Sequence, residues 1–428
     1  MQIIIHRGAQ QIGGTCVEVI SFNGSRIIMD VGMPLDVAQG NAANEQLGLY
    51  PAVEGLFSGE KKINGVFISH AHQDHYGLLS AIKPEITCFC GKATKKLIEL
   101  TALHTNRPID LSNTTTFSAG EKMRCGDFTI TPYLMDHSSF DAYAFLIQAD
   151  GKRLFYSGDF RGHGRKGKLL EAFLSHPPER VDALLLEGTM MGRGNEQCLT
   201  EPELENHIAA KLSGSDKIAF ACVSGQNIDR LVTFFRAARR CQRQVIIDPY
   251  VADVLETVNE MQPSIPALVE GFRKNLGVLY TKQACRKMRL YLRQGDKLDQ
   301  WESYRAYQAD FAQKPSRYLV LVRPGNIDAI RESTALCSKD ALFLYGQWMG
   351  YWEKDTMKNL RGWVEEQHME FIYAHTSGHA TKECLQQFVQ NLNPHCVIPI
   401  HTERPAAYDD LFKEKVKILH DGESWFLG

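Results

Sequence analysis

The sequence predicts an α/β protein in which a strand-rich sandwich is interrupted by a second, βαβ-type domain. Short apolar segments separated by glycine turns fill the chain up to about residue 190 and are typical of strands. Helical periodicity alternates with short strands from about residue 200 to 345. The last 60 or so residues return to a strand-turn-helix-strand order, so we expect them to complete the first domain.

The first part of the chain is predicted to be mostly strand. Its apolar segments are rich in β-branched and aromatic residues and are bounded by turn residues. One helix is expected around Lys92–His104. The predicted strands cover Gln2–His6, Thr15–Ile20, Arg26–Met29, Gly65–Ser69, Phe128–Met135, Tyr143–Gln148, Lys152–Ser157 and Ala183–Glu187.

The rest of the chain predicts an inserted domain and a closing segment. Domain boundaries are expected at residues 1–195, 196–345 and 346–428. Helices are predicted at Glu201–Leu212, Asn227–Arg240, Ala252–Met261 and Lys382–Asn391. Strands are predicted at Lys217–Cys222, Gln244–Ile247, Arg317–Val322, Ala341–Leu344, Glu370–Ala374 and Cys396–Ile400.

Composition favours a folded protein of the cytoplasm. Hydrophobic residues at 44% and charged residues at 23% are close to globular averages. The N-terminal apolar run is too short for a signal peptide, and no apolar stretch approaches the roughly 18 residues that would span a bilayer. Eleven scattered cysteines, an odd number, indicate reduced thiols rather than a disulfide scaffold.

Two basic stretches in the middle third could line a groove for phosphates. The net charge of −2 argues against a protein that simply coats nucleic acid, so local clusters matter more. A solvated helix face explains each stretch equally well. The stretches contain Arg230, Arg236, Arg239, Arg240 and Arg243, and then Arg273, Lys274, Lys282, Arg286, Lys287, Arg289 and Arg293.

The strongest chemical signal is His70-Ala-His72-Gln-Asp74-His75, which follows the apolar strand around Val66. Three imidazoles and a carboxylate within six positions indicate a metal site. An extended His-x-His places two side chains on one face of the chain, where they can converge on one ion. Asp74 and His75 at the following turn point to a second ion.

This hexapeptide resembles the His-x-His-x-Asp-His signature of metallo-β-lactamase-fold hydrolases. The resemblance implies an αββα sandwich and further ligands at the ends of later strands. His137 follows the strand Phe128–Met135, and Asp159 follows Lys152–Ser157. Two zinc ions, or manganese in their place, are then expected. One would bind His70, His72 and His137, the other Asp74, His75 and His401, with Asp159 bridging them.

Later motifs resemble those of the β-CASP branch, which processes nucleic acids. Glu187 resembles its first acidic motif, and His379 and His401 resemble its second and third. Histidine at the third motif accompanies RNA-processing members, whereas DNA-repair members usually carry valine there. We therefore expect Asp74, Glu187 and His379 to be catalytic, with Asp74 also orienting the attacking water.

The resemblance is closest to the RNase J type. His6-Arg7-Gly8-Ala9-Gln10-Gln11-Ile12-Gly13-Gly14 is similar to its opening strand-turn. The resemblance implies phosphate binding by four residues on two loops: Ser224, Asn227, His375 and Ser377. A helix N-terminus with hydroxyl and amide donors suits a phosphate, although helix capping also explains Ser224 and Asn227. RNase J proteins usually continue into a further C-terminal domain, whereas this chain stops at Gly428, which leaves the oligomeric state open.

The predicted function is zinc-dependent hydrolysis of RNA phosphodiester bonds, internally, from the 5′ end, or both. The expected substrate is single-stranded RNA, with a homo-oligomer or a partner protein possible and no membrane. Three alternatives stay open: a DNA nuclease, a hydrolase of small esters with the same metal core, and a partner-dependent or non-catalytic nucleic-acid-binding subunit. The metal content of the chain would distinguish the non-catalytic alternative.

Overall fold

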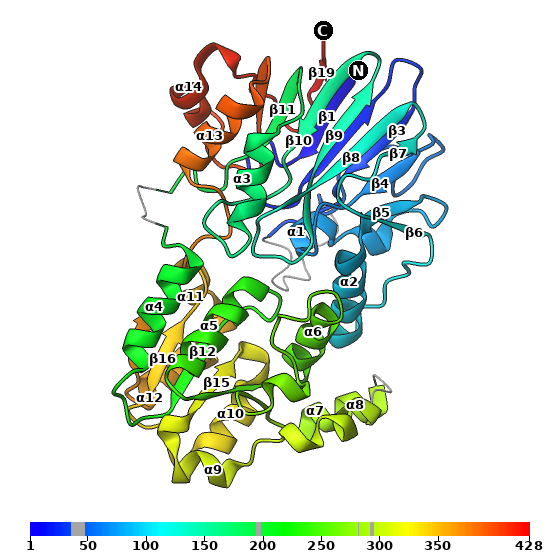
Figure 1. The fold of residues 1–428 in the computed structure, drawn as a ribbon. Coiled ribbons are helices and arrows are strands. Elements are labelled where there is room, and N and C mark those ends of the chain that lie inside the picture. Colours follow the sequence, from blue (N-terminus) through cyan, green and yellow to red (C-terminus); the bar gives the residue numbers. More distant parts are fainter. Residues whose placement is uncertain (36–47, 194–197, 281, 292–294) are drawn as a thin grey trace. The chain divides into compact units, whose positions relative to one another are not determined.

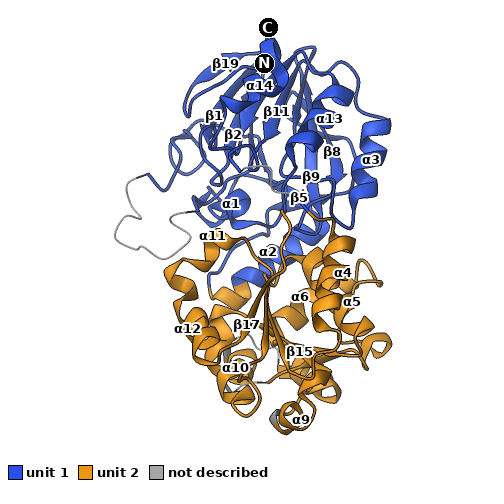
Figure 2. Ribbon diagram, turned by 90° about the vertical axis from the view of Figure 1, so that its left-hand side faces the viewer, with its two compact units in different colours: residues 1–102, 107–198, 378–428 blue, residues 103–106, 199–377 orange. Residues whose placement is uncertain are grey.

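The computed structural model divides into two compact units (Figures 1 and 2). It describes residues 1–35, 48–193, 198–280, 282–291 and 295–428. Unit 1 contains residues 1–102, 107–198 and 378–428, and unit 2 contains residues 103–106 and 199–377. The inserted unit therefore reaches residue 377 rather than the expected 345. The physical reason is that β17 (Glu370–Tyr373) pairs in parallel with β16 (Leu342–Tyr345) of unit 2.

Unit 1 is a sandwich of two sheets. The seven-stranded sheet has the order β19-β1-β2-β3-β4-β5-β6, and the six-stranded sheet has the order β18-β11-β10-β9-β8-β7. The strands of the first sheet are β1 (Gln2–Arg7), β2 (Cys16–Ile20), β3 (Arg26–Met29), β4 (Gly65–Phe67), β5 (Cys88–Gly91), β6 (Thr114–Phe117) and β19 (Ser424–Phe426). The strands of the second sheet are β7 (Met123–Cys125), β8 (Phe128–Met135), β9 (Ala142–Ala149), β10 (Lys152–Tyr156), β11 (Ala183–Glu187) and β18 (Cys396–Ile400).

A single apolar core fills the space between these sheets. Alternate residues of the facing strands point into it, as Ile3 and Ile5 do from β1 and Phe145 and Ile147 do from β9. A second core covers the other face of the six-stranded sheet, where α3 (Gly167–Ser175), α13 (Lys382–Leu392) and α14 (Ala407–Phe412) pack. The predicted α/β sandwich is confirmed.

One buried carboxylate in the first sheet is held by a histidine and an arginine. Glu18 on β2 is 2% exposed and accepts hydrogen bonds from His6 and from Arg26. Burial alone would raise the pKa of Glu18, but these bonds and the charges of both partners lower it overall. The charged form of Glu18 therefore stabilises the folded sandwich.

Unit 2 is built on a fully parallel six-stranded sheet. Its order is β14-β13-β15-β12-β16-β17, with β12 (Ala219–Cys222), β13 (Gln244–Ile247), β14 (Leu276–Val278) and β15 (Tyr318–Val322). Parallel neighbours require crossover connections, which helices supply here. The connecting helices include α4 (Glu201–Leu212), α5 (Ile228–Arg240), α6 (Pro249–Asn259), α10 (Ile327–Thr334) and α12 (Lys358–Glu366).

Side-chain caps decide where the helices of unit 2 begin. Thr200 forms a capping box with Glu203 at the start of α4. Asn227 accepts a bond from the Arg230 backbone N–H at the start of α5. Asp248 caps α6, so this helix begins at Pro249, three residues before the predicted start.

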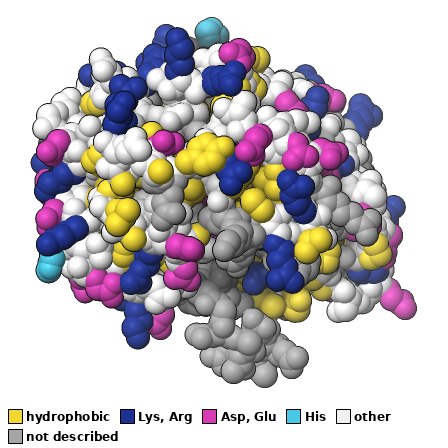
Figure 3. Space-filling view, turned by 90° about the horizontal axis from the view of Figure 1, so that it is seen from below, with side chains coloured by type: hydrophobic (Ala, Val, Ile, Leu, Met, Phe, Trp, Pro, Cys, Tyr) yellow, Lys and Arg dark blue, Asp and Glu magenta, His cyan; other side chains and the backbone are white. Residues whose placement is uncertain are grey.

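Among the described residues, the two basic stretches do not form one exposed positive groove. Arg230 and Arg243 are buried at 0% and 2% exposure, and the guanidinium of Arg243 donates to backbone carbonyls within unit 2. Arg289 is exposed and pairs with Asp299 at 3.1 Å. Arg293 lies outside the described residues. Figure 3 shows Lys and Arg interspersed with Asp and Glu on the face seen from below.

Among the residues that the structure describes, no helix has both the length and the apolar character needed to cross a membrane.

Candidate metal centre

The hexapeptide begins in the loop after β4 and ends in the short helix α1 (Gln73–Tyr76), and neighbouring backbone segments hold it. The Thr15 N–H donates to the Asp74 carbonyl at 3.1 Å, and the Val31 N–H donates to the His75 carbonyl at 2.8 Å. Gly32 passes so close that an added Cβ would lie 1.8 Å from the Asp74 carbonyl oxygen. The backbone of the motif is therefore fixed before any ligand binds.

Three histidines converge on one side of the site. His72 Nδ1 lies 3.0 Å from His70 Nε2 and 3.2 Å from His137 Nε2. His137 stands two residues beyond β8, as the sequence predicts. The extended His-x-His segment and the end of a strand from the opposite sheet thus supply three imidazole nitrogens to one point.

A second group adjoins the first. Asp74, His75 and His401 place ligand atoms within 4.8 Å of one another, and His401 Nε2 lies 3.3 Å from Asp74 Oδ2. His401 immediately follows β18 with φ of 53°, and its N–H donates to the Gly8 carbonyl at 2.7 Å. The C-terminal segment therefore completes a set that begins in the hexapeptide.

Asp159 stands between the two groups. Its Oδ2 lies 3.1 Å from His75 Nε2 and 3.9 Å from His70 Nε2, and its Oδ1 lies 3.6 Å from His401 Nδ1. The side chain is 2% exposed, and Oδ1 makes no hydrogen bond within the part of the chain that the structure describes. The structure thus brings together all seven of the predicted metal ligands.

The electrostatics of the two groups differ. Burial, followed by the charges of neighbouring histidines, lowers the pKa of His70 well below its usual value, and burial lowers that of His72 to about 4. For His75 burial would lower the pKa, but the carboxylates of Asp159 and Asp30 outweigh it and raise the pKa well above its usual value. The pKa of Asp159 is lowered well below its usual range, because the facing histidines outweigh burial.

Glu187 and His379 lie beside Asp159. Glu187 ends β11, and its carboxylate accepts from the N–H of Thr189 at 2.9 Å and of Ala380 at 3.0 Å. His379 Nδ1 is 3.6 Å from both Glu187 Oε2 and Asp159 Oδ2, and its side chain is 20% exposed. Glu187 thus fixes the segment that carries His379, and His379 is the more accessible of the two.

Sequence reasoning missed Asp30, which supports the site from behind. Asp30 is buried one residue beyond β3 and accepts from His75 Nδ1 at 2.8 Å, Tyr156 Oη at 2.6 Å and the Ser69 backbone N–H at 2.7 Å. A carboxylate behind a ligating histidine orients the ring. The one available signal was an acidic residue directly after an apolar strand, in Met29-Asp30-Val31-Gly32.

The side chains fit divalent metal ions. Neutral imidazole offers one N–H, so the three ring nitrogens that face one another cannot all be satisfied by mutual hydrogen bonds. A cation accepts the lone pair of each, and the low pKa of His70 and His72 keeps those lone pairs available at neutral pH. Imidazole nitrogens with carboxylates are the donor set that zinc prefers, and manganese is also compatible.

The four predicted phosphate-binding residues all belong to unit 2. The guanidinium of Arg230 donates to the Thr376 carbonyl at 2.8 Å and lies 3.3 Å from His375 Nδ1. Arg230 therefore connects the loop that carries His375 and Ser377 to helix α5. Asn227 caps this helix, and the exposed Ser224 lies three residues before Asn227. The side-chain oxygen of Asn227 accepts the cap bond, so its NH₂ group is the part that can donate to a phosphate.

Comparisons with known proteins agree with this geometry. Residues 43–214 match the beta-lactamase superfamily domain, and residues 368–419 match the Zn-dependent metallo-hydrolase RNA specificity domain. A solved structure of a protein of unknown function from Enterococcus faecalis V583 covers 99% of each chain with a TM-score of 0.78 and 18% identity, which shows the fold alone.

Two curated relatives are similar over part of the chain. Ribonuclease J 2 of Streptococcus pyogenes serotype M3 is 23% identical over 239 residues, which cover 54% of this chain and 42% of the relative. The RNase J-like protein of Methanocaldococcus jannaschii is 28% identical over 194 residues, covering 43% and 41%. The matches span less than half of the length of each relative.

The two-sheet sandwich and its histidine-aspartate cluster define a protein of the metallo-β-lactamase fold. The RNA specificity domain and the ribonuclease J relatives support an RNase J-like protein of the β-CASP branch of metallo-hydrolases. The predicted family resemblance is confirmed.

Proposed function

We propose that this protein hydrolyses RNA phosphodiester bonds with two metal ions, zinc by preference, held in unit 1. The names of the matched RNA specificity domain and of the ribonuclease J relatives support RNA as the substrate. The position of Asp159 carries the proposal, because this carboxylate adjoins both ligand groups. Two metal ions sharing a carboxylate are the usual arrangement for displacement at a phosphate.

The first metal would be held by His70, His72 and His137, and the second by Asp74, His75 and His401. Bound metal supplies a hydroxide nucleophile at neutral pH, by lowering the pKa of water, and offsets the charge that builds up on the phosphate. Asp74 would orient the attacking water, and Asp159 would hold the two positions at a fixed separation.

His379 is proposed to bind the scissile phosphate or to give a proton to the leaving oxygen. Its partly exposed ring beside the buried ligand sets supports this role. Glu187 would act through it, since the carboxylate fixes Ala380 and faces His379 Nδ1. His375, Ser377, Ser224 and Asn227 are proposed to bind a substrate phosphate in unit 2.

The test is cleavage of matched single-stranded RNA and DNA, each carrying a 5′-monophosphate and a label at either end. Wild-type protein, Asp74→Ala/His75→Ala and His395→Ala would be compared, with metal content measured by mass spectrometry. His395 is a matched control because its side chain is 78% exposed and lies outside the ligand sets. We expect two metals per chain and RNA cleavage in wild type and His395→Ala, with both lost in the double variant.

Other outcomes would choose among the alternatives. Equal cleavage of DNA would indicate a general nuclease. Two bound metals without cleavage of either nucleic acid would favour a small-ester hydrolase or a partner-dependent enzyme. Failure to bind metal would leave a non-catalytic RNA-binding subunit. The product ladder from end-labelled RNA would separate internal cutting from progressive 5′-end cutting.

A further inference from the structure

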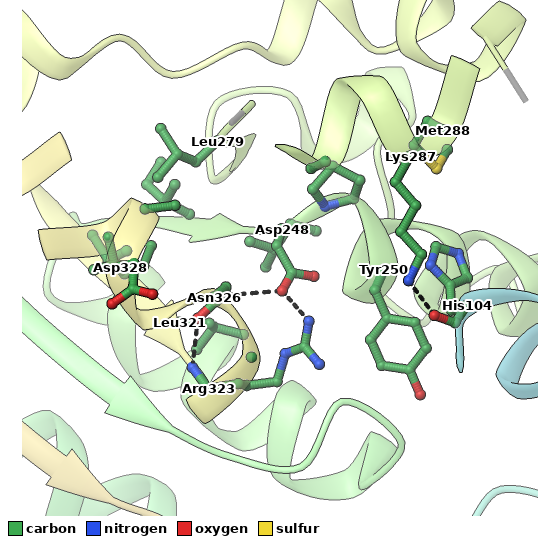
Figure 4. Close-up of a pocket in the computed structure, with 18 residues that line it drawn as sticks. His104, Asp248, Tyr250, Leu279, Lys287, Met288, Leu321, Arg323, Asn326 and Asp328 are labelled. Atoms are coloured by element: carbon green, nitrogen blue, oxygen red, sulfur yellow. Dashed lines mark hydrogen bonds and ion pairs between the residues drawn. The ribbon is translucent and has the colours of Figure 1, made fainter. Parts of the chain in front are cut away.

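Apolar surface of unit 2 is open to a ligand in a cavity and on an edge strand. The cavity has a volume of about 180 Å³, and its lining contains two cations, Lys287 and Arg323, and two carboxylates, Asp248 and Asp328 (Figure 4). Arg323 is paired with Asp248. Because the two signs of charge balance, this cavity does not select a ligand by charge. The edge strand is β17, the last strand of the parallel sheet.

One face of β17 carries aromatic side chains that remain accessible. Phe371 is 38% exposed and Tyr373 is 42% exposed, whereas Ile372 and Ala374 are buried. Successive side chains of a strand point to opposite faces. Phe371, Tyr373 and His375 therefore lie on one face, at intervals of about 7 Å along the chain.

Buried rings on the neighbouring strand β16 support the exposed ones. Tyr345 is fully buried, and its ring centroid lies 6.5 Å from that of Tyr373 and 5.9 Å from that of Phe371. Both exposed rings lie within 31° of the plane of the Tyr345 ring. Trp352, at the end of α11 (Met349–Trp352), packs against Phe371 with a centroid distance of 5.0 Å. These contacts hold the rings in place, so a ligand that binds them orders little additional side chain.

Exposed aromatic rings that are held on a sheet suit unpaired bases. Proteins bind single-stranded nucleic acid by stacking bases on aromatic side chains, and some folds present these side chains on neighbouring strands of a sheet. Every base has a flat face, so such stacking depends little on sequence. In a duplex the faces of the bases are already stacked on one another. The face of β17 therefore favours a single strand.

The charges near the rings balance one another. Glu353 and Asp355 are exposed after α11, and the cations Lys354 and Arg361 lie beside them, with Arg361 donating to the Lys354 carbonyl at 3.1 Å. Glu370 is exposed as well, but strand alternation places it on the opposite face of β17. Ring stacking, rather than ion pairing, would therefore supply the affinity at this face.

The strand continues directly into the loop that is proposed to bind a substrate phosphate. His375 follows Tyr373 by two positions, and the two ring centroids are 5.8 Å apart. The strand and the loop with Ser377 both fall within residues 368–419, the region that matches the RNA specificity domain. A strand of RNA with a phosphate at this loop can place an adjacent base against Tyr373. This continuity favours RNA over a protein partner.

We propose that Phe371 and Tyr373 form a stacking platform for unpaired bases of a single-stranded RNA whose phosphate binds at the loop of His375. The inference rests on the proposed RNA substrate. It adds two residues that hold bases, whereas the metal centre acts on the scissile phosphate. Affinity for this platform should require bases but depend little on which bases they are.

Fluorescence anisotropy of the full chain tests this with a labelled adenylate hexamer whose phosphorothioate linkages resist hydrolysis. A second probe has the same backbone without bases. Tyr373→Leu and Phe371→Leu keep an apolar side chain but remove the flat ring, whereas Tyr373→Phe keeps the ring. Tyr307→Leu is the matched control, since Tyr307 is an exposed tyrosine of unit 2 that contacts Arg305. Thermal unfolding would verify that each variant folds.

We expect Tyr373→Leu to weaken binding of the adenylate hexamer about 5- to 150-fold, the usual effect of losing the stack between one base and an aromatic ring. Phe371→Leu should weaken it in the same way. Tyr373→Phe and Tyr307→Leu should change the affinity less than about twofold, because both keep the two rings of the platform. The probe without bases should bind more weakly than the hexamer, and equally to all variants.

Three results would overturn the proposal: no binding of the hexamer, binding that neither leucine variant of the platform weakens, or equally tight binding of the probe without bases. A chain that sediments as a dimer only while Phe371 and Tyr373 are intact, with unchanged affinity for the hexamer, would also overturn it and would assign this face to a second copy. Binding that requires bases and Tyr373, without cleavage of natural RNA, would support the platform and refute hydrolysis at the metal centre. The two proposals can therefore fail separately.

Discussion

Replacing Asp30 by Asn tests whether a residue that contacts no substrate sets the affinity of the metal centre. Asn is the conservative choice for two reasons. It keeps the shape of the side chain, and it tolerates the left-handed backbone at Asp30, where φ is 58°. The substitution removes the negative charge that faces His75 Nδ1 at 2.8 Å.

The expected magnitude follows from the contacts of Asp30. Its Oδ2 accepts from His75, Tyr156 and the Ser69 hydroxyl, and its Oδ1 accepts from the Ser69 N–H. An amide has one accepting oxygen, so its NH₂ group must face at least one of these donors. We expect the metal-free fold to lose about 1–3 kcal/mol. Metal affinity should fall about 10- to 100-fold, the usual effect of losing a carboxylate behind a ligating histidine.

The assay is competition for metal against a chelating dye, with thermal unfolding of metal-free protein in parallel. Tyr156→Phe removes one hydrogen-bond donor to Asp30 but keeps the contact between Asp30 and His75. It should therefore lower the stability of the protein and change metal affinity less than Asp30→Asn does. Asp127→Asn is the surface control, since Asp127 is exposed and bonded to Ser21. If Asp30→Asn binds metal within twofold of wild type, then Asp30 does not orient His75 in the way argued.

Three further predictions concern stability. Gly32→Ala should destabilise by about 1–3 kcal/mol or more in thermal unfolding, because its Cβ meets a carbonyl, whereas Gly362→Ala, inside α12 with open space around it, should be neutral or stabilising. Arg230→Met should cost about 3–5 kcal/mol in denaturant unfolding, because it removes the positive charge that faces the fully buried carboxylate of Glu201. A loss under about 1 kcal/mol would contradict a buried ion pair. The pKa of Glu18 is lower in the folded state, so the stability that its charged form contributes is complete above its unfolded pKa of about 4.3 and is lost as pH falls through the folded pKa. The difference in unfolding free energy between metal-free wild type and Glu18→Gln should therefore shrink below pH about 4.3. A difference that stays constant with pH would refute this.

The resemblance to metallo-β-lactamase-fold hydrolases implied the candidate metal ligands. The structure brings them together because the chain segments that carry them follow apolar strands whose ends meet at one edge of the sandwich. Asp30 could not be predicted in the same way. A lone aspartate after a strand is common, and only the folded chain shows that it faces His75.

The burial of Arg230 could not be predicted from the sequence either. The partner that neutralises it, Glu201, lies in another helix 29 positions away. Short elements such as β5 and α3 were missed because four to nine residues give too little periodicity to distinguish strand, helix and loop. The boundary at residue 377 was missed because strand pairing, rather than composition, assigns β17 to unit 2.

The placement of His401 has a consequence for how the protein is made. His401 hydrogen-bonds to Gly8 across almost the whole chain, and β18, which carries it, pairs with β11. During synthesis the first eleven strands of the sandwich, β1 to β11, can form while β18 is still absent, so six of the seven predicted ligands emerge long before the last. A nascent chain should capture its first metal early and its second only after unit 2 has been translated, which makes tight binding of the second metal a late step of biogenesis.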